Sequence, residues 1–558
     1  MKTKYYNISK ITGLFLFLAL FSISACLGDF EEINRNKLRP TEKEIDYDGV
    51  ASGGYFTDFQ KRIIPTRGRG EGTDRINEYQ VTLNLASDSW AGYFSPTLNK
   101  FNNGNNFTTY YMIVGWVDYT YTTMYRNIVN PWFQIRQQTH EVKKDQDGNV
   151  TFEKKDIVNQ STYSIAQIIK IMGLHKTTDM FGPLPYSKVG SGSFLVPYDS
   201  QEVIYRSFFK ELQEAIETLN IYANNQSTLL KNYDGVYHGD VNKWMKLGNS
   251  LMLRLAMRVR YADESLAREY ANKAITNPGG LIENVADIAM LKSEGNFEYD
   301  NSLKLISDGY NDTRMGATIQ TYLKGFNDPR IASYFRKGSI NNQNDYFALR
   351  TGIPMPNNVK AHNGFSLPNI ESETPVYWFK ASETYFLKAE AALYGLIGGN
   401  AEEFYNQGIK TSFQENGVAL GDYLTRDAFP ASFEDPLNSA YNAPRPSGTS
   451  KKWSSASTRE QHLEQIITQK YLAIFPDGQE AWSEWRRTGY PKQILVFENK
   501  TNQGVLTGNG SNQGVRRFPF PQSEKIQNTE NVAKAGALLN GPDNSATRLW
   551  WDKNPNIN

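Results

Sequence analysis

Apolar side chains recur at steps of three and four residues along several segments of this 558-residue chain. This spacing places them on one face of an α-helix, as in 241–261, where Trp244, Leu247 and Leu251 follow one another. Successive segments of this kind can bury their apolar stripes against each other. The predicted pairs are 108–140 with 161–176, 201–219 with 241–261, 380–396 with 401–416, and 460–475 with 479–487.

Stacked helix pairs are typical of tetratricopeptide-type scaffolds. The consensus residues of that repeat are absent here, so the prediction depends on the periodicity of the apolar stripes. We predict a mainly α fold in which about four tetratricopeptide-like helix pairs form a scaffold, with long, loop-rich insertions on one face. Arg254 and Arg258 lie one turn apart on one of these helices, where they are either solvated or paired with carboxylates of a neighbouring element.

Residues 281–375 interrupt the helical pattern. They are rich in Asn, Gly, Asp and Ser, and they contain one short predicted helix, 314–325. An irregular segment of this length is unusual within a compact domain unless it has a function. Because this one also carries several tyrosines, we expect it to shape a ligand-binding surface that the helical scaffold holds in place.

The N-terminus predicts export. Lysines precede an apolar run, 14–26, that is shorter than the roughly 20 residues needed to cross a bilayer. A basic start, a short apolar run and small residues before a cleavage point are typical of a secretory signal peptide. Ser24-Ala25-Cys26 resembles the lipobox of bacterial lipoproteins, in which the cysteine is acylated after cleavage. The alternative is a signal anchor with an incidental cysteine.

These observations predict how the chain is organised. Cys26 is the only cysteine, so the acylated protein would have no disulfide and would depend on packing for its stability. We predict a lipoprotein signal peptide at 1–25, a lipid-anchored tether at 26–50 and a single helical domain at 51–558, with a loop-rich ligand-binding segment around 281–375.

The balance of acidic and basic residues indicates that nucleic acid is not a partner. Lys and Arg total 60 and Asp and Glu total 59, whereas nucleic-acid binders carry a basic surface. The chain holds 33 Tyr, 30 Phe and 10 Trp, a supply of rings that suits stacking on flat ligand faces.

Catalytic motifs are missing from the sequence. The five histidines are scattered, and neither a zinc-binding pair nor a phosphate-binding loop nor a nucleophile elbow is present. A glycosidase needs two carboxylates across the scissile bond, and the sequence singles out no such pair. We therefore expect no catalytic residue, no metal and no cofactor, and we keep a surface glycoside hydrolase as a less favoured alternative.

Carbohydrate binding has a simple physical basis in such a chain. The apolar face of a sugar ring packs on Trp or Tyr, and its hydroxyls bond to Asp, Asn or Arg. Candidate residues should lie on loops rather than on helical stripes, although each aromatic could equally close its loop onto the protein body. The candidates are Asp88, Trp90 and Tyr93, then Tyr310 with Arg314, and finally Tyr346 with Phe347.

Five blocks of the sequence, taken with the lipobox, resemble the SusD-like and RagB-like nutrient-binding lipoproteins. They occur in the order found in that family and cover most of the mature chain. The blocks are 179–187 (DMFGPLPYS), 314–330 (RMGATIQTYLKGFNDPR), 383–392 (ETYFLKAEAA), 405–412 (YNQGIKTS) and 469–491 (QKYLAIFPDGQEAWSEWRRTGYP).

The resemblance implies a mostly helical protein that is lipid-anchored at the cell surface, on the outer membrane. There it would bind an oligosaccharide, deliver it to a SusC-like TonB-dependent transporter and act as the lid of that barrel. In RagB-type members the ligand would be an oligopeptide, which we keep as the main alternative. Asp29, Glu31 and Glu32, just after the lipobox, resemble the acidic signal for the outer face of the outer membrane.

Overall fold

A computed structural model describes residues 50–97, 101–146, 148–354, 360–503 and 514–557. The predicted signal peptide, its Cys26 and nearly all of the tether lie outside the described residues. Residues Ser52–Asn558 form one compact unit. Every helix in the described part of the chain is too short or too polar to span a membrane.

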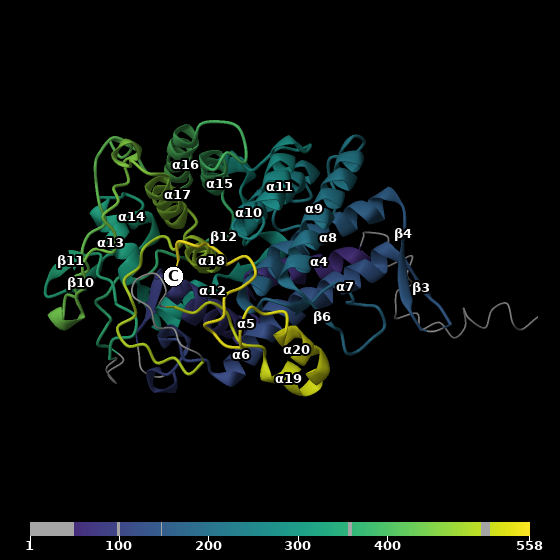
Figure 1. Cartoon of the computed structure of the whole chain (residues 1–558), viewed down its shortest axis with the longest axis horizontal. Coiled ribbons are helices and arrows are strands. Elements are labelled where there is room, and N and C mark those ends of the chain that lie inside the picture. The colour runs from purple at the N-terminus through teal and green to yellow at the C-terminus, as the bar shows by residue number, and fades with distance from the viewer. Residues whose placement is uncertain (1–49, 98–100, 147, 355–359, 504–513, 558) are drawn as a thin grey trace, which may run out of the picture. The chain divides into compact units, whose positions relative to one another are not determined.

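One half of the scaffold is a series of successive helices. They are α7 (Asn127–Thr139), α8 (Ile157–Phe181), α9 (Gln201–Ala223), α10 (Val241–Val259) and α11 (Glu264–Thr276). Helix α8 packs on α7 and α9, and α10 packs on α9 and α11, so the long helices lie side by side (Figure 1). Capping side chains set their first residues: Asp156 accepts the N–H groups of Val158 and Asn159, and Ser200 accepts that of Val203.

The other half of the scaffold lies later in the chain. Its helices are α15 (Ala381–Leu393), α16 (Ala401–Glu415), α17 (Arg459–Ala473) and α18 (Gly478–Thr488). Helix α15 packs on α16, on α17 and on α10 of the first half, so that the two halves share one core. The predicted mainly helical fold and the predicted pairing of helices are confirmed.

The structure corrects two helix boundaries. The region predicted as one helix at 108–140 consists of α6 (Val114–Tyr121), a wide π-helical turn (Thr122–Arg126) and α7, which contains Pro131. The helix predicted at 161–176 extends over the whole of α8, because Asp156 caps it early and Gly182, with φ of 84°, ends it late.

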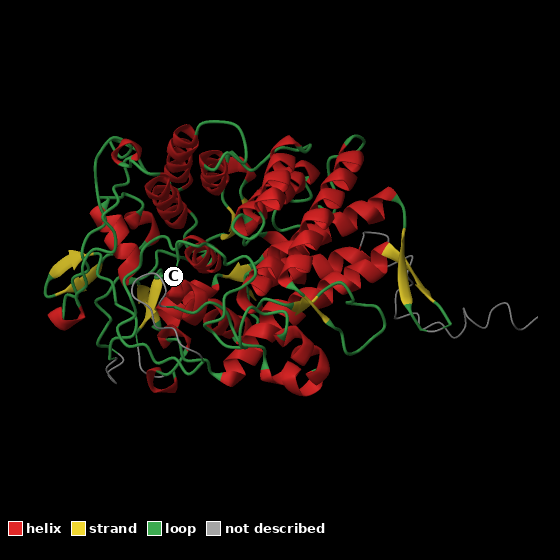
Figure 2. Cartoon of the chain, in the orientation of Figure 1, coloured by secondary structure: helices red, strands yellow, loops and turns green. Residues whose placement is uncertain are grey.

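The described residues of 281–375 form short elements joined by long loops, as expected. The elements include β7 (Ala289–Leu291), α12 (Ser302–Lys304), β9 (Thr313–Met315), α13 (Ala317–Gly325), α14 (Ile331–Tyr334), β10 (Gly338–Ile340) and β11 (Gln343–Asp345). Figure 2 shows the loops gathered around α13, α14 and the β10–β11 hairpin, at the left of the view. The strands pair two by two, and no large sheet forms among the described residues.

Buried ion pairs join the helices of the two halves. Arg254 of α10 bonds to both carboxylate oxygens of Glu383 on α15, at 2.8 and 2.6 Å. Arg258, one turn later, contacts Glu480 and Glu484 of α18. All of these side chains are at most 4% exposed. Of the two alternatives left open by the sequence, Arg254 and Arg258 are therefore paired with carboxylates rather than solvated.

The sequence blocks singled out above meet in this network. Lys470 of α17 lies 2.9 Å from Glu480 and 3.3 Å from Glu383. Arg330 bonds at 2.9 Å to both Ser412 and Gln469, which come from other blocks. The blocks therefore build the interior of the scaffold, where buried ion pairs and hydrogen bonds join residues of different blocks.

Candidate ligand-binding site

The structure brings the three groups of predicted site residues onto neighbouring segments. Strand β2 (Phe94–Pro96) pairs with β9, and the Gly316 N–H donates to the Tyr93 carbonyl. The Leu349 N–H in turn donates to the Met315 carbonyl. Segments 88–97, 310–316 and 345–349 therefore form one layer of loops and short strands, the loop-built layer, although about 250 residues separate the first from the last. Asp88 and Trp90, predicted to lie on a loop, are instead at the end of a helical stretch.

Trp90 and Tyr93 lie on the inner side of this layer. Trp90 is 5% exposed, its ring lies 4.8 Å from that of Trp482, and its Nε1 donates to the Phe107 carbonyl. Tyr93 is fully buried, stacked on Tyr471 at 4.6 Å, and its hydroxyl donates to the Tyr471 carbonyl. Neither ring has a face open to a ligand in this arrangement, so both are placed as core residues.

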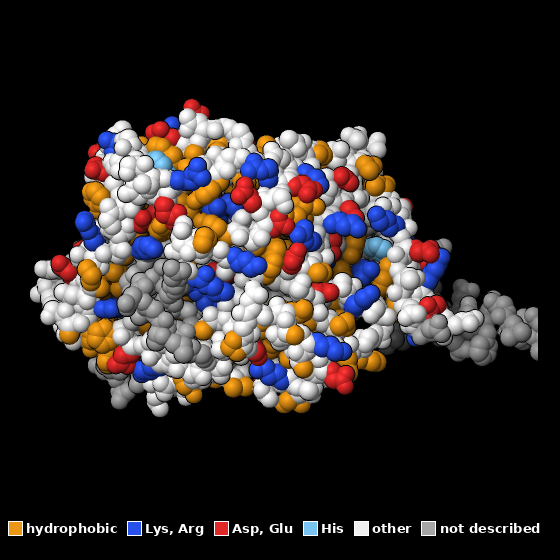
Figure 3. All heavy atoms as spheres, viewed as in Figure 1, with side chains coloured by type: hydrophobic (Ala, Val, Ile, Leu, Met, Phe, Trp, Pro, Cys, Tyr) orange, Lys and Arg blue, Asp and Glu red, His pale blue; other side chains and the backbone are white. Residues whose placement is uncertain are grey.

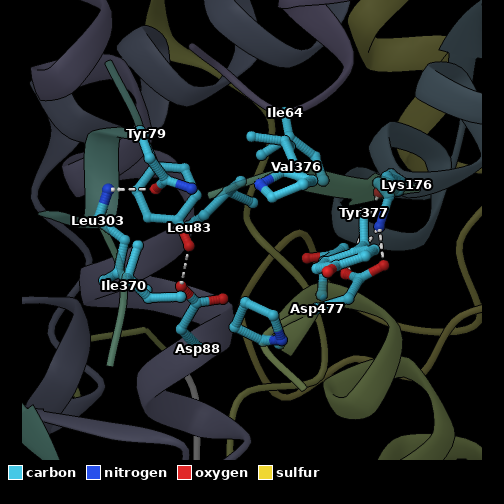
Figure 4. Close-up of a pocket in the computed structure, with 15 residues that line it drawn as sticks. Ile64, Tyr79, Leu83, Asp88, Lys176, Leu303, Ile370, Val376, Tyr377 and Asp477 are labelled. Carbon is cyan, nitrogen blue, oxygen red and sulfur yellow. Dashed lines mark hydrogen bonds and ion pairs between the residues drawn. The ribbon is translucent and has the colours of Figure 1, made fainter. Parts of the chain in front are cut away.

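Asp88 lines a small cavity (Figure 4). The Tyr79 hydroxyl donates to its Oδ2 at 3.0 Å, and the close-up shows the Lys176–Asp477 ion pair elsewhere on the wall. Burial raises the pKa of Asp88 to about 7; the Asp477 carboxylate adds to this rise, whereas the Tyr79 hydroxyl and Lys176 oppose it. The cavity volume of about 50 Å³ has room for a few water molecules rather than a sugar ring.

Tyr310 and Arg314 differ in exposure and in role. Tyr310 is partly exposed, and the amide of the following residue, Asn311, donates to the Asn363 side chain at 3.0 Å. Arg314 is 1% exposed and donates to the His362 and Thr313 carbonyls and to the Asn311 side chain. Arg314 thus ties loops together, while Tyr310 and the amide pair remain at the surface.

Tyr346 and Phe347 also differ in exposure. The Phe347 ring is 9% exposed and packs in a small cluster with Leu349, Ile353 and Phe365. Tyr346 is partly exposed, and the Lys337 ammonium lies 5.7 Å from its ring centroid. Of the aromatic candidates, therefore, Tyr310 and Tyr346 are the ones with ring surface available to a ligand.

Most charges around Tyr310 and Tyr346 are neutralised locally. Arg336 pairs with Asp308 at 2.7 Å, and Lys324 pairs with Asp345 at 2.7 Å. Figure 3 shows side chains of both signs intermixed over the face in view, without a large area of one sign. Such a surface suits stacking and hydrogen bonding more than long-range attraction of a charged polymer.

Two loops later in the chain add residues that sequence reasoning missed. Tyr441, from the 3₁₀ turn Ser439–Tyr441 within segment 416–458, contacts Phe497, from the loop at 489–503, with ring centroids 5.1 Å apart. Tyr441 also packs against the cluster that contains Phe347. In the sequence, the only indication of Tyr441 and Phe497 as site residues is that they are aromatic residues between predicted helices. That indication does not distinguish a ring at the surface from a ring that packs its loop onto the protein.

Comparisons with known proteins agree with this architecture. A family model described as SusD-like, SusD and RagB outer-membrane lipoprotein, matches residues 32–552. A chitin-binding SusD homolog from Flavobacterium johnsoniae is 35% identical, with 91% of this chain and 100% of that chain covered and a TM-score of 0.80. A SusD homolog from Bacteroides vulgatus is 32% identical, with 92% and 100% covered and a TM-score of 0.81.

A third solved structure, a SusD homolog from Bacteroides uniformis, is 34% identical, with 90% of this chain and 99% of that chain covered and a TM-score of 0.78. No match was found among curated proteins. The matched family model spans most of the chain, and the helix pairs predicted from the sequence are those of the solved relatives. This chain therefore belongs to the SusD-like family of outer-membrane lipoproteins.

Proposed function

We propose that this protein binds an oligosaccharide at the cell surface and delivers it to a SusC-like TonB-dependent transporter, for which it acts as a lid. The observation that carries the proposal is the 35% identity, over 91% of this chain, to a relative described as chitin-binding. The partly exposed Tyr310 and Tyr346, on one loop-built layer, supply rings on which sugars could stack. The exposed side-chain amide of Asn363, which accepts from Asn311 beside Tyr310, supplies a polar group for sugar hydroxyls.

Two carboxylates whose pKa values are raised by burial are poorly placed for catalysis. A glycosidase needs an acid and a base that reach the same bond. Asp88 and Asp179, whose pKa values are raised by burial, are 2% and 1% exposed and are held by internal hydrogen bonds. We therefore propose a binding protein, and incubation with labelled oligosaccharides should leave every glycosidic bond intact.

An oligopeptide ligand, as in RagB-type proteins, is the second candidate, because tyrosine-rich loops also bind extended peptides. Calorimetric titration with chito-oligosaccharides and with mixed peptides separates the two candidates. Heat of binding from the saccharides supports the proposal, whereas binding of peptides alone would replace it with the peptide function.

Tyr310→Ala should weaken saccharide binding by about 3- to 10-fold, because it removes one stacking surface. Tyr55→Ala is the matched control, since Tyr55 is also exposed (38%) but lies on the scaffold helix α4 (Val50–Ile63). Affinities measured by calorimetry should differ from the wild type only for Tyr310→Ala. Equal affinity of all three proteins would remove Tyr310 from the site.

Cys26→Ala should release the protein from the membrane, because the acylated thiol is the proposed anchor. Fractionation of cells should then find the protein outside the membrane pellet, with saccharide affinity unchanged. Retention of this variant on the cell surface would show that the transporter, rather than the lipid, holds the protein there.

A further inference from the structure

Arg350 directly follows segment 345–349 of the loop-built layer and contacts two further segments of the chain, around 441–442 and 495–497. Its Nε donates to the Leu495 carbonyl at 3.0 Å, and its Nη1 donates to the Tyr441 and Asn442 carbonyls at 3.2 Å each. The guanidinium carbon lies 5.2 Å from the centroid of the Phe497 ring. These contacts fix one edge of the guanidinium and its ring neighbour before any ligand arrives.

Arg350 has no counter-ion among the described residues. No carboxylate oxygen of that part of the chain lies within 4.0 Å of it, and burial alone accounts for the lowering of its pKa. Arg426 makes a useful comparison, because it is bonded to two backbone carbonyls in the same manner yet also pairs with Asp422 at 3.0 Å. Arg350 is therefore a partly buried cation whose charge the described part of the chain leaves uncompensated.

The surroundings of Arg350 are open to a ligand. Its Nη2 has no partner among the described residues and is not sealed from solvent. Phe497 is 38% exposed, and Tyr441 lies edge-on to it. A rigid guanidinium with free donors binds planar carboxylate or sulfate oxygens with little loss of entropy, and the neighbouring ring provides a surface for a sugar.

We propose that Arg350, Tyr441 and Phe497 form a subsite for a saccharide unit that bears a carboxylate or a sulfate group. The subsite rests on the glycan-binding function proposed above and narrows its ligand to an acidic oligosaccharide. The anionic group would accept hydrogen bonds from Nη2 of Arg350, and the sugar ring would pack on Phe497. The charge that the fold leaves uncompensated would thus be neutralised by the ligand.

The test compares the wild type, Arg350→Met, Arg350→Lys and Arg426→Met by calorimetric titration. The probes are a uronic-acid oligosaccharide, a sulfated oligosaccharide and a neutral chito-oligosaccharide. Arg350→Met should weaken binding of an acidic probe by about 10- to 100-fold and leave the neutral probe unchanged, and Arg350→Lys should fall in between. Arg426→Met should bind all probes as the wild type does, and added salt should weaken only the acidic probes.

The outcomes of this titration either support or refute the acidic-saccharide subsite at Arg350. The two acidic probes distinguish a carboxylate from a sulfate as the preferred group. If Arg350→Met weakens the neutral and acidic probes equally, Arg350 only clamps the loops and the subsite is refuted. Binding of the neutral probe alone by the wild type would also refute the subsite while leaving the glycan function intact. Absence of binding to every saccharide would overturn the proposed function itself.

Discussion

Glu480→Ala is expected to lower the free energy of unfolding by about 3–5 kcal/mol, because it removes one partner from a buried ion network. The Glu480 carboxylate lies 2.9 Å from the Lys470 ammonium and also bonds to the Arg258 guanidinium. All three side chains are at most 1% exposed, so water cannot replace the lost carboxylate. Without Glu480, the Lys470 and Arg258 cations would each lose one carboxylate partner. Glu484, which lies 3.5 Å from Lys470 and 2.7 Å from Arg258, would have to serve both. The positive charge would then be less well balanced in a medium that solvates charge poorly. Urea unfolding followed by circular dichroism measures the change.

Glu264→Ala provides the matched control for that experiment. Glu264 pairs with Arg268 at 3.0 Å, but both side chains are about half exposed or more, at 65% and 47%. An exposed pair within one helix contributes about 0.3–0.5 kcal/mol, so this variant should unfold almost as the wild type does. Similar unfolding midpoints for the two variants would contradict the view that the buried network holds the two halves of the scaffold together.

Asp88→Asn is expected to remove a pH dependence of stability that the wild type shows between about pH 4 and pH 8. The folded protein raises the pKa of Asp88 from 3.8 to about 7, so the native state binds this proton more tightly than the unfolded chain does. The stabilisation is complete below pH 3.8 and is lost as the pH rises through 7. The difference corresponds to about 4 kcal/mol, and Asn keeps an oxygen that can accept from the Tyr79 hydroxyl.

Thermal unfolding across this pH range tests the prediction. The wild type should lose stability relative to Asp88→Asn as the pH rises from 4 to 8. Tyr79→Phe extends the test, because its hydroxyl lowers the pKa of Asp88, and its removal should move the transition to higher pH. Parallel curves for the wild type and Asp88→Asn would show that folding does not raise the pKa of Asp88.

The helical scaffold could be predicted because its signal is local. Helix α10 shows the reason: Trp244, Leu247 and Leu251 recur at helical spacing, and all are fully buried. The pairing of helices followed from chain order, since short connections bring consecutive helices together. The boundaries were less predictable, because the π-helical turn at Thr122–Arg126 and the early cap by Asp156 depend on particular contacts.

The candidate site could be predicted only in part. The region 281–375 was expected to shape a ligand surface, and its Tyr310 and Tyr346 are partly exposed. Trp90 and Tyr93, chosen by the same criterion, are core residues that pack against α18 and α17. Arg350, Tyr441 and Phe497 come from loops far apart in the chain, so no spacing in the sequence could have joined them.

The sequence by itself determined the helical fold class and the family, because each depends on short-range spacing or on contiguous motifs, and it predicts export and lipid attachment in the same way. Only the tertiary structure decided which loop aromatics face the core and which arginines have carboxylate partners. Burial and charge compensation depend on contacts between segments hundreds of residues apart, such as Arg258 with Glu480, and local sequence does not encode which segments meet.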